Sequence, residues 1–143
     1  MLCHRSVRLA VLVLIAFASM SLRCGGYKKM WFRISSIVAR EGSPAPGMTV
    51  TFQVNKLDQS GKVLWDKVVD KSLTVLETGW TPEFICEFDV LYDDRSTEFV
   101  EDIRAIATVD DEGDIYKDTA TYTPVIFLND TQSFYTRIDL PRP

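Results

Sequence analysis

Side chains with catalytic potential are few in this chain of 143 residues, which contains one histidine and three cysteines. The histidine, His4, lies before a long apolar run near the start of the sequence. Segments of this kind are targeting signals that are removed after export. The mature chain is therefore expected to have no imidazole, which is the usual general base and a common metal ligand. The sequence predicts a protein that is not an enzyme.

Cys86 is the only cysteine in the body of the chain, within the segment FICEFDV. In an extended strand Cys86 shares one face with Phe84, Phe88 and Val90. Cysteine is among the residues most often buried and packs as a small hydrophobe. We therefore expect Cys86 in the core. A nucleophilic role is the weaker alternative, because no histidine would be available to activate the thiol.

The acidic turn at residues 110–114 is the most suggestive metal-binding pattern. Calcium binds six to eight oxygen atoms, and the first candidates for ligands are Asp110, Glu112 and Asp114. The order of residues does not fit an EF-hand loop. Asp and Gly are also the residues that an ordinary hairpin turn requires, so a solvated turn is the alternative. No cofactor other than calcium is suggested.

Tryptophans offer the third possible site. Trp31, Trp65 and Trp80 could line a sugar-stacking surface. Trp65 shares a face with Val63 and is expected to pack in the core. Trp80 lies in a Gly-Trp-Thr-Pro turn and is the best candidate for an exposed contact with a protein or glycan partner.

The start of the chain carries export features. Arg5 and Arg8 precede an apolar run of fourteen residues, 9–22, which is shorter than the ~20 residues of a membrane span. The run ends in Ser-Leu-Arg-Cys-Gly-Gly and resembles a bacterial lipoprotein signal, which implies that Cys24 becomes the lipid-modified first residue. Ser21 and Arg23 depart from that family's pattern. Cleavage by an ordinary signal peptidase, which would give a soluble secreted or periplasmic protein, is the alternative.

These features divide the chain into a signal peptide at residues 1–23, a flexible tether at 24–30 and a folded domain at 31–143. The signal segment holds three arginines and no acidic residue, so its removal shifts the formal net charge from −4 to −7. Residues 93–118 account for the whole excess. Nucleic acid is an improbable partner, because phosphate binding requires a basic surface.

Apolar residues in the body alternate with period two, as in half-buried strands. Residues 48–55 are one clear case, and residues 103–109 are another. Turn residues recur every 8–12 positions, for instance at residues 42–47, 58–61 and 110–114. The pattern predicts an all-β fold: an antiparallel, immunoglobulin-like β-sandwich of seven or eight strands.

Four segments carry a family resemblance: VTFQVN at 50–55, GKV at 61–63, LETG at 76–79, and Phe84. Together they resemble bacterial immunoglobulin-like and fibronectin-like modules over roughly residues 31–124. The resemblance implies an adhesive or assembly module and transfers no functional residue.

The expected function is that of an exported, lipid-anchored, non-catalytic binding or structural module of the cell envelope, held to a membrane through Cys24. The residues 93–118 would form an acidic surface for a basic partner or a cation. The alternatives are a carbohydrate-binding module that uses Trp80 and a calcium-stabilised adhesion domain.

Overall fold

The computed structural model describes residues 25–93, 98–125 and 130–142, with the backbone only at 65–70. Every regular element within these residues is a strand. The described part of the chain accordingly contains no helix long and apolar enough to span a membrane. The strands are β1 (Gly25–Arg40), β2 (Ser43–Pro44), β3 (Thr49–Asp58), β4 (Val63–Thr74), β5 (Phe84–Asp93), β6 (Glu98–Phe99), β7 (Glu101–Asp111), β8 (Asp114–Tyr122) and β9 (Thr131–Leu140).

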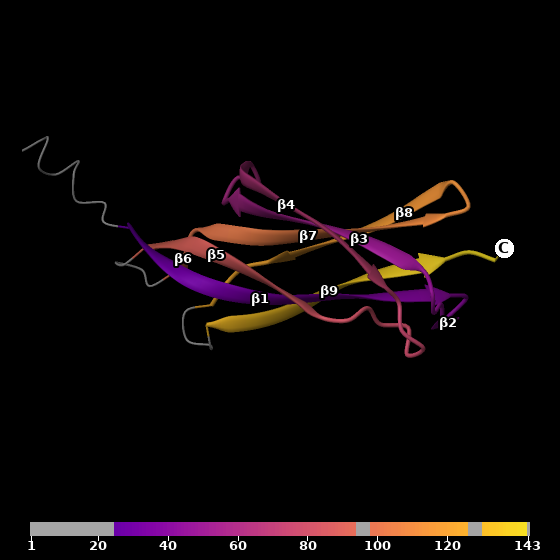
Figure 1. Ribbon diagram of the computed structural model, residues 1–143. Coiled ribbons are helices and arrows are strands. Elements are labelled where there is room, and N and C mark those ends of the chain that lie inside the picture. Colours follow the sequence, from indigo (N-terminus) through magenta and orange to yellow (C-terminus); the bar gives the residue numbers. More distant parts are fainter. Residues whose placement is uncertain (1–24, 94–97, 126–129, 143) are drawn as a thin grey trace, which may run out of the picture.

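Two sheets form the layers of a sandwich (Figure 1). In the first sheet, β1 is central, with β5 and β2 antiparallel along one edge and β9 parallel along the other. The second sheet has the order β4-β3-β7-β8, and all its pairs are antiparallel. The predicted all-β, two-layer architecture is confirmed, and the parallel β1–β9 pair is the exception to antiparallel pairing.

The strand order differs from that of a constant-type immunoglobulin domain. In that arrangement the first strand shares a sheet with the second, fourth and fifth. Here β1, the first long strand, shares a sheet with the fourth and the seventh long strands, β5 and β9. The two-layer, all-β architecture is thus combined with a strand order that differs from the constant-type immunoglobulin arrangement.

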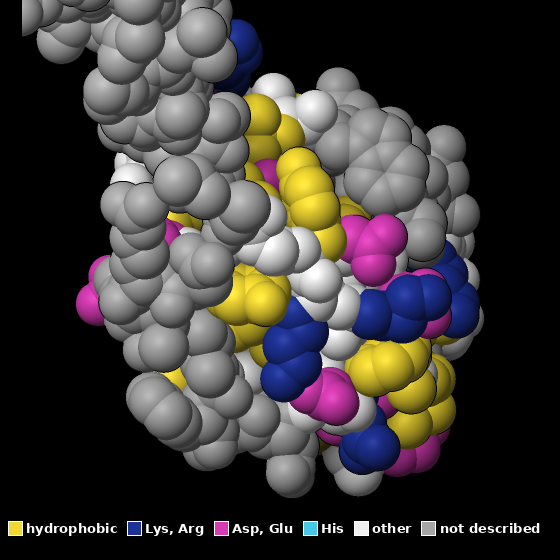
Figure 2. Space-filling model, turned by 90° about the vertical axis from the view of Figure 1, so that its left-hand side faces the viewer, with side chains coloured by type: hydrophobic (Ala, Val, Ile, Leu, Met, Phe, Trp, Pro, Cys, Tyr) yellow, Lys and Arg dark blue, Asp and Glu magenta, His cyan; other side chains and the backbone are white. Residues whose placement is uncertain are grey.

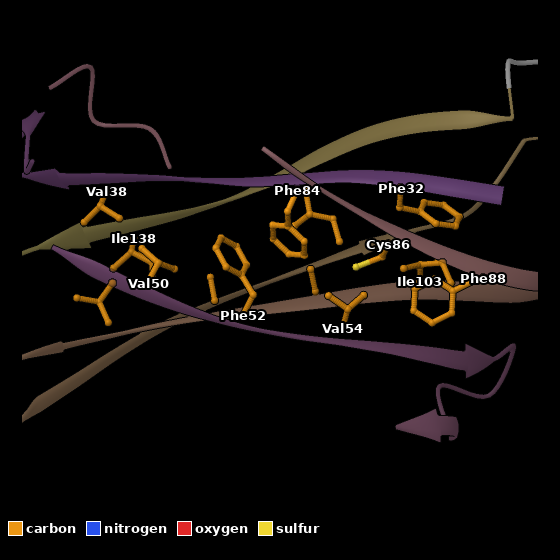
Figure 3. Close-up of a cluster of buried hydrophobic side chains, with 14 of the residues drawn as sticks. Phe32, Val38, Val50, Phe52, Val54, Phe84, Cys86, Phe88, Ile103 and Ile138 are labelled. Atoms are coloured by element: carbon orange, nitrogen blue, oxygen red, sulfur yellow. The ribbon is translucent and has the colours of Figure 1, made fainter. Parts of the chain in front are cut away.

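Alternate side chains of the long strands fill the space between the sheets (Figure 3). Phe52 of β3 and Phe84 of β5 meet edge to face across the layers, with their ring centroids 4.9 Å apart. Cys86, Phe88 and Val90 follow Phe84 on the inward face, and each is at most 3% exposed. The predicted core position of Cys86 is confirmed.

The predicted flexible tether is wrong from Gly25 onward, because Gly25–Met30 is the first part of β1. It pairs continuously with β5, from Gly25 opposite Asp93 to Met30 opposite Phe88. A Cβ atom on Gly26 would lie 2.6–2.7 Å from the ring and hydroxyl of Tyr92. Gly26 therefore permits close packing against Tyr92 and does not act as a flexible linker residue. Cys24 and the predicted signal peptide at residues 1–23 lie outside the described residues.

Candidate functional site

Trp80 is held against the edge of β1 and does not sit in a loose turn. The amide of Val38 donates to the carbonyl of Gly79 at 2.8 Å, and the amide of Thr81 donates to the carbonyl of Ser36 at 2.9 Å. Trp80 itself forms an antiparallel bridge with Ile37. These bonds extend the ladder of β1 between β5 and β2. The backbone around Trp80 is therefore hydrogen-bonded to β1 as a strand residue would be.

The Trp80 side chain is 36% exposed and meets a second aromatic residue, Tyr135 of β9. The two ring centroids are 5.3 Å apart, and the ring planes cross at 71°. Tyr135 is 56% exposed and lies opposite Ser35 in the β1–β9 register. The aromatic pair, Trp80 and Tyr135, is thus displayed on the outer face of the first sheet. Crossed rings do not form one flat platform for a sugar chain, although each ring offers an exposed surface.

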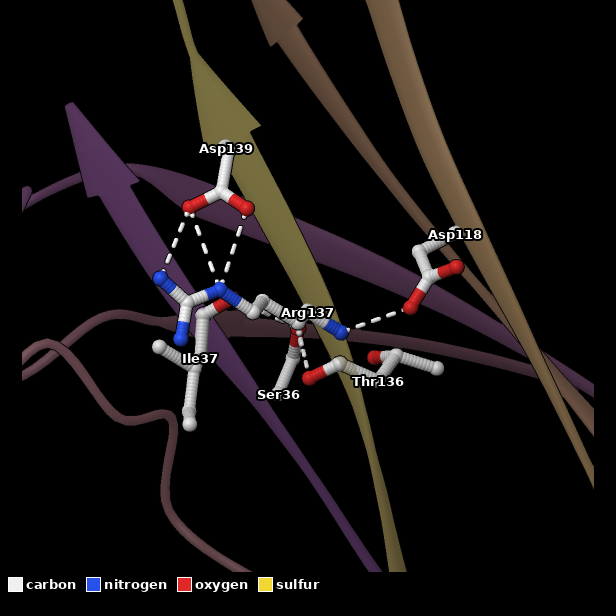
Figure 4. A network of polar contacts seen from close by, with 6 residues as sticks. All are labelled: Ser36, Ile37, Asp118, Thr136, Arg137 and Asp139. Carbon is white, nitrogen blue, oxygen red and sulfur yellow. Dashed lines mark hydrogen bonds and ion pairs between the residues drawn. The ribbon is translucent and has the colours of Figure 1, made fainter. Parts of the chain in front are cut away.

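Charged groups on the same face are arranged in pairs. The guanidinium of Arg137 donates to both carboxylate oxygens of Asp139, at 3.0–3.2 Å from Nε (Figure 4). The hydrogen bond and the charge of Arg137 lower the pKa of Asp139. Further along, Lys29 and Trp31 Nε1 both contact the carboxylate of Glu87 at 2.8 and 3.0 Å.

The acidic turn is a tight two-residue hairpin loop. Glu112 and Gly113 have φ values of 56° and 101°, as a type I′ turn requires. The Asp110 carboxylate accepts the amide of Gly113 at 2.8 Å, and that of Asp111 accepts two bonds from Arg40 at 2.7–2.8 Å. The Asp110 carboxylate thus stabilises the turn, and the Asp111 carboxylate is paired with the guanidinium of Arg40.

No three histidine, cysteine or acidic side chains within the described residues are grouped so as to hold a metal ion. The predicted ligand set Asp110, Glu112 and Asp114 is not among such groups in this part of the chain, and calcium binding there stays a prediction. Asp114 pairs with Asp111 in the ladder and is exposed. Asp93, from the same acidic stretch of sequence, pairs with Gly25 at the start of β1. The described acidic residues of 93–118 are therefore spread over both ends of the sandwich and do not form one acidic surface.

The end of the sandwich at which β1 starts, hereafter the N-terminal end, contains an open hollow of about 520 Å³. Its lining combines four apolar or aromatic residues with four polar ones: Tyr27, Leu64, Leu91 and Val100, and Asp58, Gln59, Ser60 and Glu101. Tyr27 is 66% exposed and Leu64 46%. Figure 2 faces this end and shows hydrophobic side chains at the surface between charged ones.

A buried ion pair borders the hollow, which its acidic member, Glu101, lines. Lys56 Nζ lies 3.0 Å from Glu101 Oε2, and the two side chains are 12% and 6% exposed. Lys56 also donates to the carbonyl of Asp89 at 2.9 Å, and Glu101 accepts the amide of Leu91 at 2.7 Å. The pair therefore ties β3 and β7 of one sheet to β5 of the other.

Sequence reasoning missed Tyr135 and the Lys56–Glu101 pair. Alternation along β9 places Ile138 and Leu140 inward and so Tyr135 outward, which could have identified its exposure. Glu101 and Lys56 lie 45 positions apart, and no local pattern connects them. The Trp65 side chain lies outside the described residues.

No protein-family model matches the chain, and no curated protein matches it significantly. Among solved structures, 3-chlorocatechol 1,2-dioxygenase from Rhodococcus opacus 1CP is similar over 79% of this chain, with 11% identity and a TM-score of 0.38. This chain spans 60% of the length of that enzyme. An alternative pilotin from the type II secretion system of Vibrio cholerae is similar over 78% of this chain and 96% of its own, with 17% identity and a TM-score of 0.34. At these values neither likeness identifies a family or a function.

Proposed function

We propose that the protein is an exported, lipid-anchored module of the cell envelope that acts through its surface and not through catalysis. The observation that carries the proposal is the pattern of residues 1–24: a basic start, an apolar run of fourteen residues and a cysteine. Gly25, the first described residue, is already paired in β1, so a strand lies close in sequence to the proposed modification site. A mature chain that starts there has no histidine, which supports a binding role.

Mass spectrometry of the mature N-terminus tests the lipid anchor. The wild-type chain should begin at Cys24 with an acyl modification and fractionate with membranes. Cys24→Ser should abolish the modification, while the matched leader variant Cys3→Ser should leave it unchanged. An unmodified N-terminus downstream of Cys24 would refute the proposal.

Carbohydrate binding is the second candidate function, and the exposed Trp80–Tyr135 pair is the observation that favours it. Trp80→Ala and Tyr135→Ala should each weaken binding to a glycan found on an array. Tyr27→Ala removes a more exposed ring elsewhere on the molecule and serves as the matched control. A silent array would eliminate this candidate.

Calcium-stabilised adhesion is tested by thermal unfolding. Addition of calcium would raise the melting temperature if the turn at residues 110–114 held the ion in solution. An unchanged melting temperature with calcium and with chelator would remove this alternative.

A further inference from the structure

The attachment point of the proposed anchor leaves no spacer before the folded body. Cys24 directly precedes Gly25, which is already paired with Asp93 in the ladder of β1 and β5. Tyr27 is three residues after Cys24, so the two Cα atoms are at most about 10 Å apart. A lipid-modified cysteine lies at the membrane interface, and the N-terminal end must therefore approach the headgroups.

The chemistry of the N-terminal end suits that position. Tyr27 is 66% exposed at the rim of the hollow, and Leu64 is 46% exposed in its wall. Tyrosine is enriched at membrane–water interfaces, because its ring is apolar and its hydroxyl remains hydrated. An exposed aromatic ring and an aliphatic wall are costly in water and favourable among headgroups.

Three lysines of this end are engaged by acidic groups. Lys28 Nζ lies 2.7 Å from Asp130, and Lys29 Nζ lies 2.8 Å from Glu87. Lys56 is paired with Glu101. These three charges are balanced locally and the Asp58 carboxylate also lines the hollow, so the surface is suited to neutral headgroups and not to strongly anionic lipid.

We infer that the N-terminal end of the sandwich, with Tyr27 at its rim, rests on the neutral headgroup layer of the membrane to which Cys24 is anchored. This inference rests on the proposed lipid anchor. It also sets the orientation, since β1 then leads away from the membrane. Its last residue, Arg40, lies fifteen residues after Gly25, or about 50 Å along the strand.

The two most exposed tyrosines provide an internal comparison. Tyr27 is 66% exposed and Tyr135 56%. Tyr135 lies opposite Ser35 of β1. Ser35 is eight residues after Tyr27, which places it about 26 Å further along the strand. Only Tyr27 should therefore be shielded by a bilayer.

The experiment uses the mature chain from residue 24 to 143, coupled through the Cys24 thiol to a maleimide lipid in phosphatidylcholine vesicles. Cys86 is 3% exposed and should not react. A membrane-impermeant reagent iodinates the tyrosines, and mass spectrometry compares coupled and uncoupled protein. The iodination rate of Tyr27 should fall about fivefold on vesicles, with little change at Tyr135.

Equal rates at Tyr27 with and without vesicles would overturn the inference. Protection of Tyr27 that instead rises with protein concentration in the absence of vesicles would identify a second copy of the chain as the occupant, and would overturn it too. Chemical coupling separates this test from the proposed function. If the native chain lacks the acyl group, the proposed anchor fails, while the iodination pattern still decides whether this end contacts lipid.

A second measurement uses a single-chain lipid coupled at Cys24, because one acyl chain binds membranes only marginally. Tyr27→Ser should then accelerate transfer between phosphatidylcholine vesicles about threefold. Tyr135→Ser is the matched control and should leave the transfer rate unchanged. Equal effects of the two variants would contradict a specific contact at Tyr27.

Discussion

The two ends of the sandwich are closed by the same kind of contact, a carboxylate paired with a basic side chain, in different surroundings. At the N-terminal end, Glu101 and Lys56 are 6% and 12% exposed. At the far end, where β1 reaches the β7–β8 turn, Asp111 and Arg40 are 18% and 26% exposed. Burial raises both the strength of a pair and the cost of losing one partner. The ends should therefore differ in how much stability depends on a single charge.

The far end is also built from two similar turns. Glu41-Gly42 joins β1 to β2, Glu112-Gly113 joins β7 to β8, and both residues of each turn have positive φ. Arg40 and Asp111, which bind each other, are the residues directly before these two turns. One ion pair therefore connects the turns of the two sheets.

The largest effect is expected from Glu101→Gln. The substitution leaves Lys56 buried without its counter-charge, which should cost about 3–5 kcal/mol of unfolding free energy. Urea unfolding measures the loss. The double variant Lys56→Met/Glu101→Leu removes both charges and should be less destabilised than Glu101→Gln alone. A double variant that is worse would show that packing, and not the unpaired charge, dominates this end.

Replacing a turn glycine by alanine should lower the unfolding free energy equally at both ends. Gly113 at the far end has φ 101° and Gly61 at the N-terminal end has φ 80°, and a Cβ added at either position would meet no atom within 4 Å. Alanine at either position should cost about 1–2 kcal/mol from backbone strain alone. Thermal unfolding of the two variants measures this. Clearly unequal losses would mean that the ends differ in backbone strain as well as in burial.

Asp111→Asn should cost about 1 kcal/mol, less than Glu101→Gln, because the Arg40 pair is more exposed to solvent. The loss should shrink when unfolding is measured at high salt, since ions screen the pair. The exposed neighbour Asp114→Asn is the matched control and should have little effect. A loss as large as that of Glu101→Gln would remove the distinction between the ends.

The smallest effect concerns acid stability. Hydrogen bonds from Ser60 and from the amide of Lys62 lower the pKa of Asp58 at the N-terminal end. Ionised Asp58 therefore stabilises the fold above its unfolded pKa near 3.8, and this contribution is lost as the pH falls through the lower folded pKa. Ser60→Ala should return the Asp58 pKa toward its ordinary value in an NMR titration.

Asp139 provides the comparison for that titration. Its pKa is lowered by the guanidinium of Arg137, which is an exposed charge. High salt should therefore raise the pKa of Asp139 and leave that of Asp58 nearly unchanged. Equal shifts at both residues would show that charge, and not local hydrogen bonding, controls Asp58.

Local patterns predict much of this fold. The period-two alternation in residues 48–55 and 103–109 corresponds to β3 and β7, and the inward position of Cys86 follows from the same rule. The turns at residues 58–61 and 110–114 can be predicted from the sequence because hairpin turns favour Gly and Asp. The tether prediction fails at Gly25 and Gly26 because glycine occurs both in flexible linkers and at closely packed positions. The position of the Tyr92 ring against Gly26 shows that this glycine is closely packed, and the sequence does not reveal that contact.

The sequence by itself determined the strand content and the inward faces of β3, β5 and β7, because these depend on neighbouring residues, and it predicts an export signal ending at Cys24. Tertiary structure decided which charges meet. It separated Asp93 from Asp110, joined Arg40 to Asp111 and buried Lys56 against Glu101. These contacts depend on which strands pair, and strand order follows from packing across the whole chain and not from any local period.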